Sequence, residues 1–372
     1  MKRIAAGLCL GMIACLAADD LGSPHEVFNG HFAILPRWTA ALPGDSLQLT
    51  GGLADTTGKI VQELRVLWTS SDSTIATVDS RGRLRTHRFG TVTVQGLLGD
   101  SVKDLTVVVT PPVLVGAGDI ASCVSKGDEA TAAILDTVPG IVIAPGDIAY
   151  ESGSDDDFAQ CYAPSWGRHR LRTRPAPGNH EYLTPGARSY YDYFGANAGN
   201  PDQGYFSYDV AGWHVIVVNS SVDVGADSPQ LQWLVKDLAA NRARCTVAYW
   251  HHPVFTSGPN GSAVRMRTVW RALYDFGADI IINGHDHVYE RFAPQDPNGN
   301  ADSIRGIRQF TVGTGGRSLY PLFSIRAKNS QVGSSATYGV LKLTLHPSSY
   351  DWVFIPVTPD KFQDSGTADC HS

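Results

Sequence analysis

The sequence lacks the features that would point to a membrane-spanning, zinc-finger or nucleic-acid-binding protein. After residue 14, no apolar run is long enough to cross a bilayer. No two cysteines have the CxxC spacing, which argues against a zinc site built on thiolates. Asp and Glu number 36 against 30 Lys and Arg, so the net charge is −6 and no nucleic acid binding is expected. An anionic substrate would be attracted only locally, for instance by bound cations.

Two common catalytic and nucleotide-binding motifs are also missing. There is no GxSxG elbow for serine hydrolysis and no Walker A loop. The stretch VLVGAGDIA does fit the GxGxxA pattern of dinucleotide-binding proteins. However, Asp119 would place a negative charge in the pyrophosphate cradle, and the helix that should follow is delayed. The pattern therefore does not favour dinucleotide binding.

The N-terminus reads as a targeting segment. The chain begins with MKR, and a short apolar run over residues 4–14 follows. This predicts a signal peptide over residues 1–18, with cleavage near Ala18. The box MIAC, which ends at Cys15, resembles a bacterial lipoprotein signal and gives an alternative in which Cys15 is lipidated. Either alternative predicts an exported protein that is secreted, periplasmic or lipid-anchored at the cell surface, and membrane contact would come only through that anchor.

The remaining cysteines are even in number. Two of the six lie in the leader, and four remain in the mature chain: Cys123, Cys161, Cys245 and Cys370. Disulfides are expected in an exported chain, and four cysteines allow three connectivities. Among these we favour Cys123–Cys161 with Cys245–Cys370.

Residues 27–111 have the pattern of an all-β sandwich domain. Short β-branched segments are separated by Gly, Asp and Ser. The run VLWTSSDSTIATVDSRGRLRTHRFGTVTVQG resembles the group-2 bacterial immunoglobulin-like domain. The resemblance implies adhesion or spacing, with contact at a cell surface, and not chemistry. Pro111 and Pro112 form a stiff link that marks the boundary.

Residues 112–372 alternate apolar strands with helical segments, which predicts an α/β core. Helices are expected over residues 128–138, 228–241 and 266–276. In the second of these, Ser228 fits the N-cap and Pro229 the first helical position. The acidic run over residues 155–157 is interpreted as a solvated loop or helix start.

Polar residues follow the predicted strands. In open α/β sheets, ligands bind beyond the carboxyl ends of the strands, so five separated segments are expected to converge. They supply Asp119; Asp147 with Tyr150; Asn179 with His180; His251 with His252; and His285 with His287. Each residue alone also fits an ordinary role, as a turn former or a surface histidine. Together they offer mixed oxygen and imidazole donors, which suit zinc, iron or manganese. The donors are too many for one ion, and a bridging carboxylate would hold a pair about 3.5–4 Å apart.

These segments carry a family resemblance. GD at 118–119, GDIAY at 146–150, GNHE at 178–181, AYWHHP at 248–253 and GHDHVYER at 284–291 resemble the calcineurin-like metallophosphoesterases, and most of all the purple acid phosphatases. The resemblance spans about residues 113–356 and implies a sandwich of two sheets flanked by helices. It implies a first metal, ferric iron, on Asp119, Asp147, Tyr150 and His287. It implies a second metal, zinc, manganese or iron, on Asp147, Asn179, His251 and His285.

The substrate side is less determined. The resemblance places His180 beside the phosphoryl group, where it would contact an oxygen or protonate the leaving group. His252 and Arg291 are candidates for supporting a ligand or contacting substrate, with packing roles as the alternative. Plant purple acid phosphatases have further histidines in the loop after the ligand histidine. Here that loop is PVFTSGPNGSAV, and Asn260 is the candidate in their place. Asp286, Tyr289 and His214 are expected to be structural or supporting.

The sequence thus predicts an exported acid phosphatase-like enzyme. A metal-bound hydroxide would hydrolyse small phosphate monoesters at a dinuclear site. A phosphodiesterase or nucleotidase using the same site is one alternative, which only the shape of the pocket would separate. An inactive surface-binding protein is the other, although its complete set of ligands argues against it.

Overall fold

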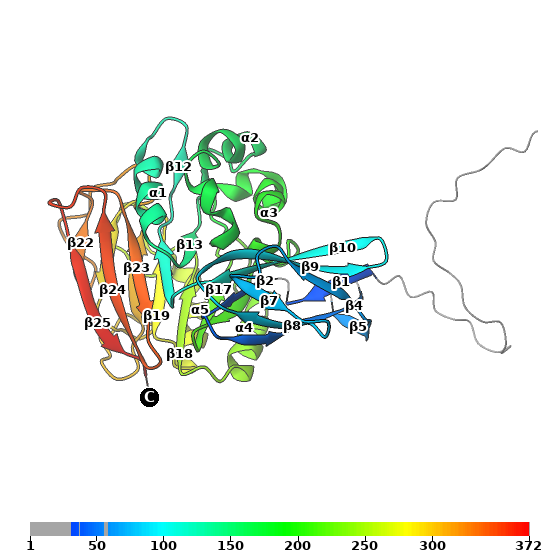
Figure 1. Ribbon diagram of the computed structural model, residues 1–372. Helices are drawn as coiled ribbons and strands as arrows, with labels where there is room; N and C mark the ends of the chain where they lie inside the picture. Colours follow the sequence, from blue (N-terminus) through cyan, green and yellow to red (C-terminus); the bar gives the residue numbers. More distant parts are fainter. Residues whose placement is uncertain (1–30, 37, 56–58, 372) are drawn as a thin grey trace, which may run out of the picture.

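The computed structural model describes residues 31–36, 38–55 and 59–371. The predicted signal peptide over residues 1–18 and the lipidation candidate Cys15 lie outside these residues. Figure 1 shows an all-β part at the N-terminal side and a larger α/β part that follows it. In the described part of the chain, no helix combines the length and the apolar character needed to cross a membrane.

The N-terminal part consists of three small sheets around an apolar core. Their orders are β1-β4-β5, β2-β10-β9-β6 and β3-β8-β7. The strands are β1 (His31–Leu35), β2 (Trp38–Ala41), β3 (Ser46–Gln48), β4 (Thr50–Ala54), β5 (Ile60–Glu63), β6 (Leu67–Ser70), β7 (Ala76–Val78), β8 (Arg83–Thr86), β9 (Gly90–Leu98) and β10 (Ser101–Val109). In β9 and β10, alternate residues such as Val92, Val94 and Leu105 are buried. This alternation is the pattern of strands with one face on a core, and the all-β prediction is confirmed.

The α/β part contains two large sheets. The first has the order β15-β13-β11-β23-β24-β25, and the second β16-β17-β18-β19-β21-β20-β22. The first sheet is built from β11 (Val113–Gly116), β13 (Ile141–Pro145), β15 (Thr173–Ala176), β23 (Gly339–Leu345), β24 (Ser349–Pro356) and β25 (Asp364–Asp369). The second is built from β16 (Phe206–Val210), β17 (Trp213–Val217), β18 (Cys245–Tyr249), β19 (Ile280–Asn283), β20 (Tyr289–Phe292), β21 (Arg308–Val312) and β22 (Ser330–Ser334). A small parallel pair, β12 (Ala121–Ser122) and β14 (Ala149–Tyr150), lies next to the strand ends.

Helices flank the two sheets, as predicted. The α-helices are α1 (Gly127–Thr137), α2 (Asp155–Asp157), α3 (Arg188–Phe194), α4 (Pro229–Ala240) and α5 (Arg267–Asp275). The shorter π- and 3₁₀-helices are η1 (Phe158–Tyr162), η2 (Trp166–Arg172), η3 (Glu181–Leu183), η4 (Pro185–Ala187), η5 (Gly195–Ala198) and η6 (Val264–Met266). The Ser228 side chain caps α4 by accepting the Leu231 N–H at 3.2 Å, and Pro229 is the first residue of that helix. The acidic run over residues 155–157 forms α2, which Ser154 caps.

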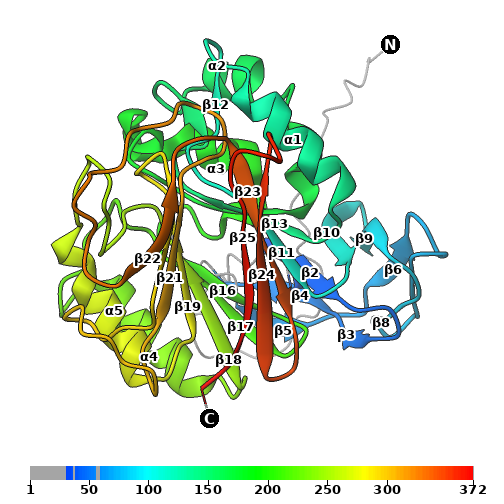
Figure 2. The ribbon, with the colours of Figure 1, turned by 90° about the vertical axis from the view of Figure 1, so that its left-hand side faces the viewer.

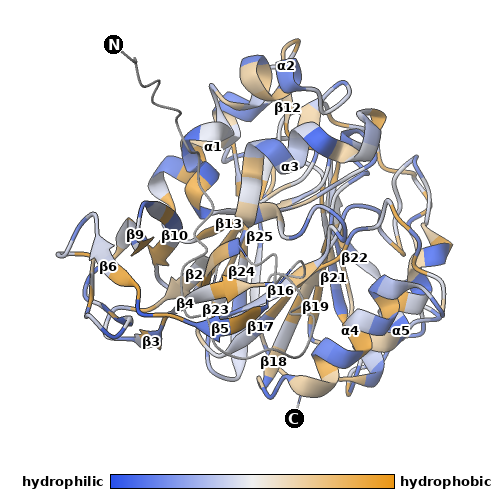
Figure 3. Cartoon of the chain, turned by 90° about the vertical axis from the view of Figure 1, so that its right-hand side faces the viewer, coloured by the Kyte–Doolittle hydropathy of each residue, from blue (hydrophilic) through white to orange (hydrophobic). Residues whose placement is uncertain are grey.

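The main core lies between the two sheets, and a second core lies under α4 and α5. Val115, Val247 and Phe310 belong to the first core. Trp250 and Trp270 belong to the second, where helices α4 and α5 pack on the outer face of the seven-stranded sheet. Figure 2 shows these two helices outside that sheet. In Figure 3 both helices alternate between hydrophilic and hydrophobic colours, as expected for amphipathic helices.

The parallel strands set the position of the functional loops. Strands β11, β13 and β15 run parallel, as do β17, β18, β19 and β21. Their carboxyl ends therefore meet along one edge, where loops from both sheets can converge.

Two disulfides tie this part together, and they are the pair favoured from the sequence. Cys123 is bonded to Cys161, and Cys245 is bonded to Cys370. Cys245 is the first residue of β18, and Cys370 follows β25. The second bond therefore links the two large sheets covalently.

Candidate functional site

Three of the predicted ligands occupy an uncommon backbone conformation. Asp119, Asp147 and His285 have φ angles of 59°, 51° and 72°. Each follows a glycine at the end of a strand, in the left-handed region that non-glycine residues seldom adopt. Holding a residue there costs on the order of 1–3 kcal/mol and requires support from the surrounding structure. Such conformations cluster at functional sites, and here they direct three candidate ligands.

One group of donors surrounds Asp119. The Tyr150 hydroxyl lies 2.9 Å from Asp119 Oδ1 and 3.2 Å from Asp147 Oδ2. His287 Nε2 lies 3.3 Å from Asp119 Oδ1 and 3.3 Å from the Tyr150 hydroxyl. All four side chains are buried. The structure thus brings together the four residues predicted to hold the first metal.

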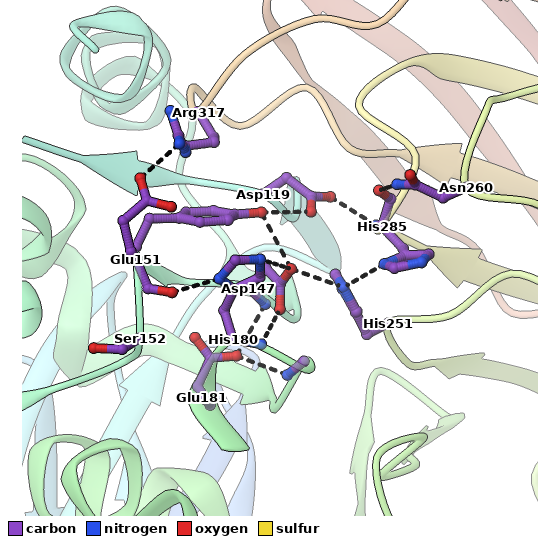
Figure 4. A network of polar contacts seen from close by, with 12 residues as sticks. Asp119, Asp147, Glu151, Ser152, His180, Glu181, His251, Asn260, His285 and Arg317 are labelled. Atoms are coloured by element: carbon purple, nitrogen blue, oxygen red, sulfur yellow. Dashed lines mark hydrogen bonds and ion pairs between the residues drawn. The ribbon is translucent and has the colours of Figure 1, made fainter. Parts of the chain in front are cut away.

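A second group shares Asp147. His251 Nε2 lies 3.1 Å from Asp147 Oδ2 and 3.2 Å from His285 Nδ1. Figure 4 shows Asp147, His251 and His285 in one continuous network. Asn179 lies between Gly178, which is packed closely on Asp147, and His180, whose N–H donates to Asp147 Oδ1 at 2.9 Å. Asp147, Asn179, His251 and His285 are the residues predicted to hold the second metal.

Two observations indicate that this set of donors fits metal ions. First, Asn179 Oδ1 is buried and has no hydrogen-bond partner within the described residues, which is the state expected of an amide oxygen reserved for a cation. Second, the ion-pair partners of the buried Asp119 and Asp147 in the described part of the chain are histidines. Bound cations would supply the positive charge that two buried carboxylates need. One ligand atom each of Asp119, Asp147 and His251 lies within 4.8 Å of the others.

The histidines differ in their affinity for protons in the metal-free protein. Burial alone would lower the pKa of His251, but the negative charge of Asp147 outweighs it and raises the pKa to about 9. Burial, and then the positive charge of His251, lowers the pKa of His285 to about 4. A metal would have to displace the proton from His251, so metal affinity should fall as the pH is lowered.

Neighbouring groups fix the orientation of the ligand rings. The His251 Nδ1–H donates to the Pro145 carbonyl oxygen at 3.0 Å, which directs Nε2 toward Asp147. His287 Nδ1 lies 2.7 Å from Ser318 Oγ, and its ring stacks on Tyr320 with centroids 4.1 Å apart. Partners of this kind set the tautomer and direction of a metal-binding imidazole.

Glu181 supports the loops that carry two of the candidate ligands. Its buried carboxylate accepts the backbone N–H groups of Asp147 at 3.0 Å, Ile148 at 2.7 Å and Gly178 at 2.7 Å. Burial, and then the negative charge of Asp147, raises the pKa of Glu181 to about 7 in the metal-free protein. The carboxylate joins the loop that carries Asp147 to the loop that carries Asn179.

His180 and His252, which are not in the predicted ligand sets, both lie at the site. His180 Nε2 is 3.8 Å from Asp147 Oδ2, and its Nδ1–H donates to the Glu151 carbonyl oxygen at 2.5 Å. The His252 ring lies 4.4 Å from that of His285, centroid to centroid, and its Nδ1 contacts Ser220 Oγ at 2.8 Å. Burial, and then the charges of nearby histidines, lowers the pKa of His252 to about 2, so it is neutral at physiological pH.

Asn260 joins its own loop to the site. Its side-chain amide donates to the His285 carbonyl oxygen at 2.6 Å, and its backbone N–H donates to Asp286 at 2.9 Å. The buried Asp286 also accepts the Thr256 hydroxyl at 2.5 Å. Asp286 thus holds the loop in a supporting role. The exposed Asn260 is placed beside a candidate ligand, and its contact with substrate stays a prediction.

Of the two alternatives for Arg291, the contacts of its side chain favour packing. Its guanidinium forms a two-point ion pair with Asp364, at 2.8 and 3.0 Å, and lies 5.0 Å above the Trp352 ring. The Tyr289 hydroxyl donates to the same carboxylate at 2.7 Å. The Arg291 side chain is therefore engaged in packing between β20 and β25. The partner carboxylate comes from β25, which the motif GHDHVYER does not reveal.

His214 is structural, as expected, and gives a prediction about stability. It lies between Asp209 and Asp237, at 2.8 Å from each, and its side chain is only 4% exposed. Burial would lower its pKa, but the two carboxylates raise it to about 9. A raised folded-state pKa stabilises the protein below the unfolded pKa of about 6.5, and this contribution is lost as the pH rises toward 9.

We therefore expect His214→Gln to lower the free energy of unfolding at pH 6 by about 1–2 kcal/mol, after allowance for the exposed Asp209. The difference from the wild type should shrink between pH 7 and 9, as measured by urea unfolding. His346→Gln is the control, because His346 is partly exposed and paired with the partly exposed Asp351. A His214 variant whose deficit is constant with pH would contradict this interpretation.

Sequence reasoning missed several supporting residues. Glu181 was visible as the last residue of GNHE but was given no role. Ser318 and Tyr320 lie about thirty positions beyond His287 in the sequence, in a segment without a recognisable motif. Such partners are selected by three-dimensional proximity, for which a single sequence carries no signal.

Comparison with known proteins gives the same families as the motifs. The calcineurin-like phosphoesterase family matches residues 115–289, and the bacterial Ig-like domain (group 2) matches residues 31–109. Purple acid phosphatase 22 of Arabidopsis thaliana is 28% identical over 194 residues, covering 47% of this chain and 44% of that protein. Purple acid phosphatase 15 of the same plant is 25% identical over 195 residues, covering 42% and 37%. The chain thus spans less than half the length of these relatives.

Solved structures support the fold. Purple acid phosphatase PPD1 from yellow lupin seeds superimposes with a TM-score of 0.64 at 15% identity, covering 92% of this chain and 74% of its own. PhoD superimposes with a TM-score of 0.54 at 12% identity, covering 89% of each chain. At these identities the likeness is one of fold alone.

Proposed function

Because this chain carries a calcineurin-like phosphoesterase domain with purple acid phosphatase homologues, preceded by a bacterial Ig-like domain, we propose that it is an exported, dinuclear-metal phosphatase acting on phosphate monoesters. The observation that carries the proposal is the convergence of two buried carboxylates, a buried tyrosine and three histidines around one point, beside an amide oxygen without a partner. We also propose the boundary between the two parts at residues 111–112. The two disulfides fit export to an oxidising compartment.

The chain offers two sets of ligands that share one carboxylate. The proposed first set is Asp119, Asp147, Tyr150 and His287, and the proposed second set is Asp147, Asn179, His251 and His285. Two bound metal ions would activate the attacking water and neutralise the charge that develops on the phosphoryl oxygens. The buried Tyr150 favours ferric iron for the first ion, with zinc, manganese or iron as the second.

His180 is the proposed proton donor to the leaving oxygen. Because its Nδ1–H already donates to the Glu151 carbonyl, Nε2 is the ring atom that faces Asp147 and the site. To assist departure of the alcohol, Nε2 must carry a proton and release it as the bond to phosphorus breaks. The hydrogen bond at Nδ1 keeps the ring in the orientation that this transfer needs.

The test is phosphate release by the purified mature protein loaded with iron plus zinc or manganese. We expect turnover of p-nitrophenyl phosphate to exceed that of bis-p-nitrophenyl phosphate, and both to stop after dialysis against a chelator. Restoring the metals should restore activity together with a visible tyrosinate absorption band. Preference for the diester would favour a phosphodiesterase. Metal-loaded protein without turnover of either ester would favour a binding protein, and a colourless active protein would exclude iron on Tyr150.

A further inference from the structure

Arg317 lies beside the candidate metal site on a fixed stretch of backbone. Its backbone N–H donates to the Asp119 carbonyl oxygen at 3.0 Å, and the backbone N–H of Gly315 donates to the Gly118 carbonyl oxygen at 2.9 Å. Gly316 has a φ of 151° and packs so closely on Asp128 that a Cβ would lie 2.2 Å from the Asp128 backbone nitrogen. The segment before Arg317 is therefore held against the strand end that carries Asp119.

The Arg317 guanidinium lies over the face of a candidate metal ligand. It is 5.2 Å from the centroid of the Tyr150 ring, whose hydroxyl points to Asp119 and Asp147. Its Nη2 lies 2.5 Å from Glu151 Oε1. The same Glu151 holds His180 through its backbone carbonyl oxygen. Figure 4 shows Arg317 and Glu151 at one end of the network and His285 and Asn260 at the other.

This arginine is accessible and largely uncommitted. A quarter of its side chain is exposed, and Glu151 is 64% exposed. A guanidinium has five N–H groups, and within the described residues one side-chain hydrogen bond, to Glu151, engages those of Arg317. By contrast, Arg265 donates to the carbonyl oxygens of Ser220 and Val222. Arg317 thus combines positive charge, free donors and access to solvent at the rim of the site.

We propose that Arg317 binds a non-bridging oxygen of the substrate phosphate and selects monoesters over diesters. The inference rests on the proposed function and adds a specificity residue to it. A monoester carries an additional ionised oxygen that a diester replaces with an ester group. A guanidinium pairs most strongly with the doubly charged phosphoryl group of a monoester, which has three non-bridging oxygens against two in a diester. Without substrate, the Arg317 side chain is paired with Glu151. An incoming phosphate would share the guanidinium with Glu151 or displace Glu151 from it.

The test compares Arg317→Gln and Arg317→Lys with the wild type as metal-loaded protein. For p-nitrophenyl phosphate, we expect the glutamine variant to raise KM, and the Ki of inorganic phosphate, at least about tenfold, which is the loss of one charge-assisted hydrogen bond. The effect on kcat/KM for bis-p-nitrophenyl phosphate should stay below about threefold, and lysine should restore part of the difference. Glu151→Gln should lower the Ki of phosphate, because it removes the competing carboxylate.

Arg168→Gln is the matched control, since Arg168 is a partly exposed arginine paired with Asp136. Metal content and the tyrosinate band of the Arg317 variants should equal those of the wild type. Equal losses on both esters, or a changed band, would overturn the proposal in favour of a structural role. Calorimetric titration with inorganic phosphate tests Arg317 without turnover. If Arg317→Gln binds phosphate as tightly as the wild type, the proposal fails, whereas an inactive wild type that binds phosphate through Arg317 would refute only the proposed reaction.

Discussion

Asp147→Asn should reduce phosphate release from p-nitrophenyl phosphate by at least about a thousandfold. The Asp147 side chain contacts both groups of donors, through Tyr150 at 3.2 Å and His251 at 3.1 Å. The asparagine removes its negative charge, which must offset two cations. The asparagine oxygen can still accept the backbone N–H of His180, whose nitrogen lies 2.9 Å from Asp147 Oδ1 in the wild type. Loss of activity would therefore follow from the lost charge rather than from a collapsed loop.

Metal content separates these causes. We expect the variant, analysed by plasma mass spectrometry after loading and desalting, to retain less than one ion per chain while its circular dichroism stays unchanged. Asp136→Asn is the matched control, because Asp136 is a partly exposed carboxylate that pairs with Arg168 and His169. A variant that keeps two ions and more than a tenth of the wild-type activity would show that Asp147 is not the bridging ligand.

Glu181→Gln should have the second-largest effect, although Glu181 does not enter the proposed ligand sets. The carboxylate accepts four backbone N–H groups from two loops. The glutamine side chain has a single oxygen that can accept hydrogen bonds. Its NH₂ group would face backbone N–H groups, which are also donors. Leaving a buried N–H without an acceptor costs about 1–3 kcal/mol. We expect the free energy of unfolding to fall by about 2–4 kcal/mol, and metal affinity to fall about 10–100-fold.

Denaturant unfolding of the metal-free protein and metal titration measure the two effects separately. The control is Glu63→Gln, an exposed glutamate in β5. If Glu181→Gln weakened metal binding without loss of stability, Glu181 would have a direct electrostatic role. If it changed neither, the hydrogen bonds to the loops would be of little consequence.

The parts of the protein that local sequence patterns specify were predicted well. Glycine followed by a carboxylate or histidine, directly after an apolar strand, identified Asp119, Asp147 and His285, and the structure brings these residues together. The cap at Ser228 and the helix after it depend on neighbouring residues, so they too were visible in the sequence. The ends of the predicted helices differ from the observed ones by one residue.

Features that depend on distant partners could not be predicted in this way. The order of the strands in the two sheets, the π-helix η1 and the ring stacking of Tyr320 on His287 have no local signature. Arg291 shows the converse problem, since a residue in a strong motif proved to be bound to Asp364, 73 positions away. Partners and accessibility, which distinguish Arg317 from Arg291, become visible only when the chain is folded.

The two disulfides have a consequence for a protein exposed to proteases. One covalent loop, 123–161, contains Asp147 and Tyr150, and the other, 245–370, contains His251, His285 and His287. A single cut in the exposed stretch around Ile325 would fall inside the second loop. The two fragments would then remain one covalent molecule until a reductant separated them. A nicked protein would thus keep strands β22 to β25 attached to the part of the chain that carries the three histidines.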